Sequence, residues 1–189
     1  MRDRTTGVTA THPPGATAPA RDATHDEALT AFVIDHYDRL LGLARLICRD
    51  VTDAADAVQI GLEQAWKARA DLRDPDRLRS WLDRIVAREA IRVSQRRRSW
   101  VARLVVHQPD VAWLDLVDPR RDLTPELTTL RDAFAKLPAD QRAVVALHHY
   151  AGYSVAETAD LVGAPVETVR TRLRRATDRL RREFEETER

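Results

Sequence analysis

The spacing of apolar residues along the chain predicts a protein built from amphipathic helices. Over residues 26–48, apolar side chains recur every three or four positions, which is the period of one buried face of an α-helix. The same period returns over 54–66, where it ends at Trp66, and over 78–93. Thr52 precedes the second stretch as a candidate N-cap residue. We therefore expect three helices that pack against one another in a small bundle.

The C-terminal part of the chain repeats the helical period and adds specific signals for helix ends. One apolar stripe runs over 126–137 and stops at Pro138, and a further helix is expected over 140–153. Ser154 and Glu157 then form the S-x-x-E pattern of a capping box, in which each residue satisfies a backbone N–H of the other. This pattern predicts that another short helix begins there.

The sequence after that short helix is typical of a helix-turn-helix. Gly163 suits a left-handed residue that ends a helix, and Pro165 suits the first turn of the next one. In a helix-turn-helix the second helix enters the major groove of DNA and its N-terminal residues meet base edges. Between residues 165 and 182 there are seven arginines against two acidic residues. The candidate DNA-contacting residues are Glu167, Thr168, Arg170, Thr171, Arg172, Arg174 and Arg175.

A second arginine-rich stretch lies in the N-terminal bundle. Residues 79–98 contain seven arginines and two acidic residues, Asp83 and Glu89. The simplest alternative is a solvated arginine-rich helix, but one such helix in each half of the chain favours binding to a polyanion. Trp81 lies in the apolar register, which favours the core over a surface on which unpaired bases stack. The candidate DNA-contacting residues here are Arg84, Arg88, Arg92, Arg96, Arg97 and Arg98.

Composition excludes several other classes of site. The chain has 189 residues and a formal net charge of only +1, so acidic residues elsewhere balance the two basic stretches. Cys48 is the only cysteine, which rules out an internal disulfide, and its apolar surroundings place it in the core. His148 and His149 are adjacent and point to different sides of a helix. We expect no metal site and no cofactor.

Membrane and enzymatic functions find no support in the sequence. No stretch approaches the ~20 apolar residues that a membrane span requires, and the N-terminus lacks the apolar core of a signal peptide. We expect a cytoplasmic protein without membrane insertion. No P-loop, GxSxG, HExxH or paired-cysteine pattern is present, so a small enzyme with a small-molecule substrate is the less favoured alternative, which a turnover assay would test.

These signals predict an all-α fold of two small helical domains joined by a linker. Residues 1–25 are rich in Thr, Ala and Pro and are predicted to be a disordered tail. The N-terminal domain covers 26–99, and the C-terminal domain with the helix-turn-helix covers 126–186. The linker, 100–125, contains three prolines together with apolar and acidic residues. About 25 extended residues reach at most roughly 80–90 Å.

Four quoted segments, in this order, resemble the extracytoplasmic-function (ECF) group of bacterial RNA polymerase sigma factors. They are "DAADAVQIGLEQAWKAR", "RSWLDRIVAREAIRVSQRRR", "KLPADQRAVVALHHYAGYSVAETADLV" and "GAPVETVRTRLRRATDRLR". The resemblance covers roughly residues 26–185. It implies a factor that binds core RNA polymerase and directs promoter-specific initiation of transcription, with no catalytic residue of its own.

The resemblance also implies roles for the residues singled out above. Asp56, Gln59 and Glu63 would dock on core polymerase. The turn at 70–78 and the basic helix after it would open the promoter −10 element and hold it as a single strand. The last helix would read the −35 element in the duplex. The linker would thread into the polymerase. The implied partners are core polymerase, promoter DNA and an anti-sigma factor that holds the two domains together.

Three positions depart from the family pattern. Ile60 stands where an acidic residue is usual, Arg88 where Asn is frequent, and Pro165 where Ser is usual, which removes a side-chain cap. The main alternative function is a freestanding helix-turn-helix transcriptional regulator. Such a regulator needs a dimerisation surface to read two half-sites, for which the sequence offers no further module. A gel shift with and without core polymerase distinguishes the two.

Overall fold

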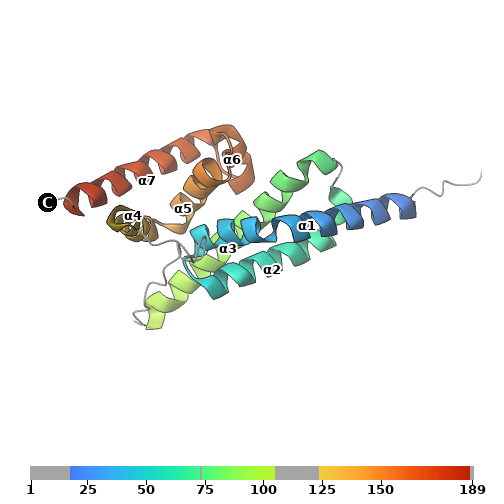
Figure 1. The fold of residues 1–189 in the computed structure, drawn as a ribbon, viewed down its shortest axis with the longest axis horizontal. Helices are drawn as coiled ribbons and strands as arrows, with labels where there is room; N and C mark the ends of the chain where they lie inside the picture. Colours follow the sequence, from blue (N-terminus) through green and yellow to red (C-terminus); the bar gives the residue numbers. More distant parts are fainter. Residues whose placement is uncertain (1–17, 73, 105–123, 188–189) are drawn as a thin grey trace, which may run out of the picture.

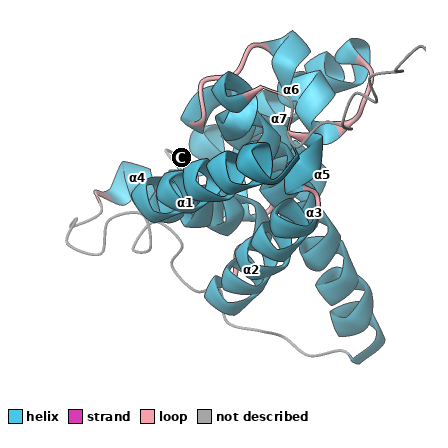
Figure 2. Cartoon of the chain, turned by 90° about the vertical axis from the view of Figure 1, so that its right-hand side faces the viewer, coloured by secondary structure: helices cyan, strands magenta, loops and turns pink. Residues whose placement is uncertain are grey.

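The computed structural model describes residues 18–72, 74–104 and 124–187, and every regular element within those ranges is a helix (Figures 1 and 2). The all-α class predicted from the sequence is confirmed. In chain order the elements are α1 (Ala18–Cys48), α2 (Val51–Lys67), the 3-10 turns η1 (Arg69–Asp71) and η2 (Pro75–Arg77), α3 (Leu78–Leu104), α4 (Pro125–Ala135), α5 (Ala139–Val145), the π-helical turn η4 (Ala146–Tyr150), α6 (Val155–Val162) and α7 (Val166–Thr187).

Helices α1, α2 and α3 form the predicted N-terminal bundle, but α1 begins earlier than expected. The helix starts at Ala18, so the prediction of a disordered tail is wrong for residues 18–25. This segment contains three alanines, the residue with the highest helix propensity, and Pro19 lies in the first turn, where proline is tolerated. The rest of the predicted tail, 1–17, lies outside the described residues.

Two other predicted boundaries in the bundle are also wrong. The N-cap of α2 is Asp50 rather than Thr52, and its carboxylate accepts a hydrogen bond of 3.0 Å from the backbone nitrogen of Asp53. Helix α3 continues to Leu104, past the predicted domain boundary at residue 99. No proline or glycine occurs after the apolar stripe until Pro109, so the chain carries no strong stop signal before that position.

The helix expected over 140–153 is divided in the structure. Helix α5 ends at Val145, and the π-helical turn η4 carries the chain on to Tyr150. Gly152 then adopts a left-handed conformation, with φ of 81°, which glycine allows without steric cost. The backbone nitrogen of Tyr153 donates back to the carbonyl of Leu147 at 3.1 Å. The turn thus reverses the chain directly before the capping box.

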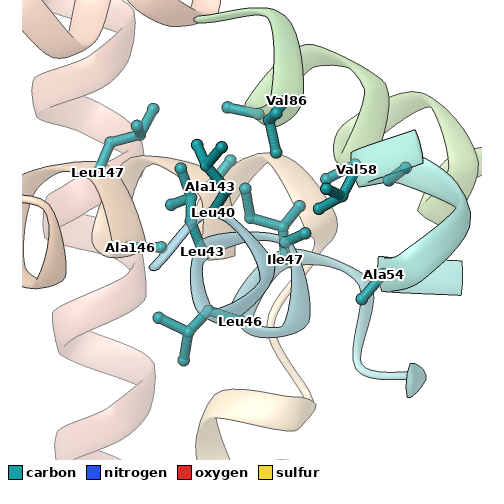
Figure 3. Packing of buried hydrophobic residues seen from close by; sticks show 14 of the residues in the cluster. Leu40, Leu43, Leu46, Ile47, Ala54, Val58, Val86, Ala143, Ala146 and Leu147 are labelled. Carbon is teal, nitrogen blue, oxygen red and sulfur yellow. The ribbon is translucent and has the colours of Figure 1, made fainter. Parts of the chain in front are cut away.

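The apolar core is continuous between the N-terminal and C-terminal halves. In Figure 1, α4 to α7 gather at one end of the bundle formed by α1 to α3. Leu40 and Leu43 of α1 and Val86 of α3 are fully buried in one cluster with Ala143 of α5 and Leu147 of η4 (Figure 3). The two predicted helical domains therefore pack against each other, which the sequence did not indicate.

The apolar pattern predicted the burial of one tryptophan correctly and that of another wrongly. Trp81 packs against the core cluster, as its register predicted. Trp66 was expected on the inward face of α2, yet it is 45% exposed. It lies in the last turn of α2, and the guanidinium carbon of Arg69 lies 5.1 Å from the centre of its ring. A cation–π contact therefore covers a ring that the core does not bury.

Cys48 is buried in the core, as predicted, and this makes its reactivity testable. Its thiol lies 3.4 Å from the carbonyl oxygen of Ala90, and burial raises its pKa to about 12. Because the thiolate is the reactive form, we expect slow reaction with Ellman's reagent at about pH 8 in native protein and fast reaction in urea. Equal rates in the two conditions would contradict the described packing.

Candidate nucleic-acid interface

The frame of the helix-turn-helix forms as the sequence predicted. The Ser154 hydroxyl accepts from the backbone nitrogen of Glu157 at 3.2 Å, and the Glu157 carboxylate accepts from that of Ser154 at 2.8 Å. These hydrogen bonds hold the pKa of Glu157 below its usual value. Gly163 ends α6 in the left-handed conformation, with φ of 70°. Pro165 directly precedes α7, and its carbonyl accepts from Val169.

The first turns of α7 present most of their predicted DNA-contacting residues to solvent. Arg170 forms an exposed pair with Glu167 one turn earlier, with nitrogen and oxygen 2.9 Å apart. Thr168 and Thr171 are half-buried beside them. The exposed predicted residues on this surface are Glu167, Arg170, Arg174 and Arg175. Residues three and four positions apart share a side of a helix, so these side chains form one continuous face, which we call the α7 face.

One residue of the predicted set on α7 turns inward. The guanidinium of Arg172 lies 3.0 Å from the carboxylate of Asp140 on α5, and the two side chains are only 30% and 35% exposed. This ion pair holds α7 against α5. Base contact by Arg172 would require breaking this ion pair. Among the residues predicted on α7, Arg172 therefore has the least structural support for a contact with DNA.

The exposed side of α3 is more basic than the residue count of the sequence suggests. Both acidic residues of the stretch, Asp83 and Glu89, are buried, at 0% and 2% exposure. Arg84, Arg92 and Arg96 are exposed. Arg92 forms an ion pair with the carboxylate of Glu89 one turn earlier in the same helix. Because the carboxylates of Asp83 and Glu89 are both buried, this surface, which we call the α3 face, exposes arginines but no carboxylate from the basic stretch.

The remaining predicted arginines of α3 differ in their surroundings. Arg97 bridges the carboxylates of Asp50 and Asp53 at the start of α2, at 2.9 Å from each. It therefore anchors α2 to α3 and is less available to DNA than its neighbours. The side chain of Arg98 lies outside the described residues.

The polar contacts around Asp83 were missed by the sequence analysis. Its two carboxylate oxygens accept from the guanidinium of Arg39 on α1 at 2.7 and 2.9 Å. The hydroxyl of Tyr153, from the turn before α6, donates to the same carboxylate at 2.7 Å. Burial, followed by the charge of Asp83, raises the pKa of Tyr153. The tyrosine therefore stays protonated as a hydrogen-bond donor.

Two arginines link the halves through backbone carbonyls. Arg88, a predicted DNA-contacting residue on α3, donates to the carbonyl of Leu161 in α6 at 2.9 Å. Arg142 of α5 is buried and donates to the carbonyl of Ile47 in α1 at 2.8 Å and to the hydroxyl of Ser94 in α3 at 2.9 Å. The sequence analysis assigned no role to Arg142.

The residues that the family resemblance assigns to polymerase docking share one surface. Asp56, Gln59 and Glu63 are all exposed on α2. Their spacing of three and four positions puts them in one row along the helix. Ile60, the departure from the family pattern, is half-buried next to this row. The role of the row stays a prediction.

The described part of the chain holds neither a metal-binding cluster nor a membrane-spanning helix. There, no three His, Cys, Asp or Glu side chains come close enough together to hold a metal ion. Within residues 18–72, 74–104 and 124–187, no helix combines the length and apolar character that a membrane crossing requires.

The fold and these surfaces define a helical DNA-binding protein with a helix-turn-helix in its C-terminal half. Comparison with known protein families identifies which class of DNA-binding protein this is. Residues 32–101 match the family described as Sigma-70 region 2, and residues 127–180 match Sigma-70, region 4. The chain belongs to the ECF group of RNA polymerase sigma factors, which direct promoter-specific initiation of transcription. A freestanding regulator is not favoured.

The relatives and solved structures agree with this assignment. The chain is 33% identical over 150 residues to the ECF sigma factor SigM of Mycobacterium tuberculosis H37Rv, covering 78% of this chain and 72% of SigM. It is 32% identical over 167 residues to the sigma-E factor of Streptomyces avermitilis, covering 85% and 88%. CnrH, solved with the cytosolic domain of CnrY, aligns with a TM-score of 0.59 and 29% identity over 88% of this chain and 94% of CnrH. RpoE of Bartonella quintana, solved with the anti-sigma factor NepR, has the same fold, with a TM-score of 0.63 and 24% identity over 88% and 97% of the two chains.

Proposed function

We propose that the N-terminal bundle engages the −10 element and the C-terminal domain the −35 element of one promoter. The observation that carries the proposal is the pair of arginine-rich surfaces, the α3 face and the α7 face, one in each of the two matched sigma regions. Each arginine that neutralises a phosphate releases counterions, so both surfaces favour DNA in a salt-dependent way.

The kind of surface on each half determines which promoter element we assign to it. The α7 face lies at the start of the second helix of a helix-turn-helix, the position that meets base edges in duplex DNA. The α3 face belongs to a helix without that motif, which suits contacts to the backbone of an unpaired strand. We assign the −10 role to the bundle of α1 to α3 and the −35 role to the domain of α4 to α7.

Polymerase docking belongs, in this proposal, to the row of Asp56, Gln59 and Glu63 on α2. The chain itself performs no catalysis and works in the cytoplasm, where the polymerase supplies the active site. An anti-sigma partner is part of the proposal, because RpoE of Bartonella quintana was solved with one.

Run-off transcription tests the proposal directly. Core polymerase is incubated with a library of genomic fragments, with and without the chain. We expect discrete transcripts that start at a common motif only when the chain is added. Transcription that is equally unselective in both reactions would overturn the function. Strong and specific binding of the same fragments without polymerase would instead support the freestanding regulator.

A further inference from the structure

Arg92 differs from the other exposed arginines of the α3 face in having a buried partner. Its guanidinium pairs with the carboxylate of Glu89 one turn earlier, and the side chain of Arg92 is nevertheless 52% exposed. Arg84 and Arg96 are exposed as well, and neither pairs with a carboxylate of the described residues. The α3 face therefore carries one arginine that is anchored to a buried anion, beside others without such an anchor.

The carboxylate of Glu89 is itself held by α2. Nε2 of Gln64 donates to Oε1 of Glu89 at 2.8 Å, and Arg92 donates to the same oxygen. A Cβ atom placed on Gly61 would lie 3.2 Å from a methyl carbon of Val86, so α2 and α3 approach each other closely in this region. Because a buried charge is costly to leave unpaired, we expect the carboxylate to keep both donors.

This anchor changes what Arg92 offers to DNA. A guanidinium carries five N–H donors in a rigid planar fork, and the pair with Glu89 uses the nitrogen Nη1. Since about half of the side chain is exposed, donors remain available to a ligand. A side chain that is already held in one direction loses less conformational freedom on binding. The arrangement therefore suits a contact that requires a defined direction.

The carboxylate also compensates the charge of Arg92. Sequence-independent attraction to DNA comes from positive charges that neutralise phosphates and release counterions. Arg92 contributes little to that attraction, because Glu89 already balances its charge. Sequence is read by hydrogen bonds to base edges instead. Guanine presents two acceptors, O6 and N7, and an arginine fork that donates to both is the commonest specific contact.

We propose that Arg92 is a specificity-determining residue that reads a guanine of the −10 element, and that Glu89 is the positioning residue that orients it. The inference rests on the proposed function, in which the α3 face meets the −10 element. Arg84 and Arg96 then supply phosphate contacts that do not depend on sequence. The two kinds of contact respond differently to substitution, which makes the assignment testable.

Arg92→Lys is the first test, because lysine keeps the charge but presents a compact ammonium in place of the fork. Run-off transcription with core polymerase uses a promoter recovered from the genomic library, with its −10 element randomised. We expect wild type to prefer a G·C pair at one position by about tenfold or more, and Arg92→Lys to lose that preference. The control, Arg96→Ala, should weaken all −10 sequences alike and lower the salt dependence of binding.

A modified base tests the atom that Arg92 contacts. In 7-deazaguanine a C–H group replaces the N7 acceptor, while pairing with cytosine is kept. Placed at the preferred guanine, it should lower transcription by wild type and leave transcription by Arg92→Lys unaffected, because only the fork uses N7. An equal loss with both proteins would mean that another residue reads this base.

Glu89→Gln tests the positioning role, because it removes the buried charge and keeps the shape of the side chain. If Glu89 only added negative charge near DNA, its loss would strengthen binding to every −10 sequence equally. We expect the preference for guanine to fall instead, with a steeper salt dependence, since the released charge of Arg92 then attracts phosphates. The control is Glu27→Gln, at an exposed position of α1, which should match wild type.

A double variant separates positioning from a loss of folding. Residues that act through one contact show non-additive effects. In the Arg92→Lys background, Glu89→Gln should therefore cause no further change in −10 base preference. Circular dichroism and co-purification with core polymerase check that each variant folds and docks. An equal loss of transcription from all −10 sequences in both backgrounds would show that Glu89 only supports the fold, and its positioning role would be overturned.

The outcomes for wild type distinguish this inference from the proposed function. If wild type selects promoters but Arg92→Lys keeps the same −10 base preference, the inference is overturned and the proposed function stands. A recovered −10 motif without any preferred G·C pair also overturns it. If wild type selects no promoter at all, the proposed function fails, and the inference fails with it.

Discussion

Replacing Arg174 by alanine is expected to lower −35-dependent transcription about ten- to hundredfold while leaving binding to core polymerase unchanged. Arg174 is exposed on the α7 face, one turn after Arg170. Loss of an arginine that contacts a base edge costs about 1–3 kcal/mol, and loss of a phosphate contact also weakens the salt dependence of binding. Run-off transcription at several salt concentrations measures both, and co-purification with polymerase measures docking.

The same helix offers a matched control for this substitution. Arg179→Ala removes one positive charge at an exposed position further along α7, beyond the first turns that enter the groove. It should reduce transcription only modestly. Equal losses for Arg174→Ala and Arg179→Ala would mean that overall charge, rather than base contact, governs recognition. Loss of polymerase binding by Arg174→Ala would contradict the assignment of separate docking and −35 surfaces.

Replacing Asp83 by alanine is expected to destabilise the folded chain by about 3 kcal/mol. The carboxylate is fully buried and accepts from Arg39 and Tyr153. Removing one partner of a buried ion pair typically costs about 3–5 kcal/mol because the other charge loses its compensation. Water reaches Arg39 in part, at 21% side-chain exposure, so the lower end of that range applies. Urea unfolding followed by circular dichroism gives the free energy.

Asp35→Ala is the control, because Asp35 is exposed on α1. Surface substitutions of this kind usually change the free energy of unfolding by less than about 0.5 kcal/mol. An Asp83→Ala protein as stable as the control would show that the contacts with Arg39 and Tyr153 contribute little net stability. The described interface would then rest on apolar packing and on the remaining polar contacts, those of Arg88 and Arg142.

Local signals predicted much of the fold because they depend on neighbours within one or two turns. The apolar period located the helices, and the Ser154–Glu157 box and the left-handed Gly163 formed as predicted. The predicted helix boundaries were wrong where a weak capping or propensity signal competed with a stronger one. Asp50 replaced Thr52 as the N-cap of α2, and alanines extended α1 back to Ala18.

The sequence by itself determined the helical class, the helix-turn-helix and the two arginine-rich stretches, because helical period, capping and local charge are properties of adjacent residues. Only the tertiary structure decided which charges remain free. Asp83 and Arg142 are buried, Arg172 pairs with α5, and Arg88 caps α6. Each of these outcomes depends on a partner distant in the chain. The apolar period identifies which face of a helix is buried, but it does not identify the helix against which that face packs.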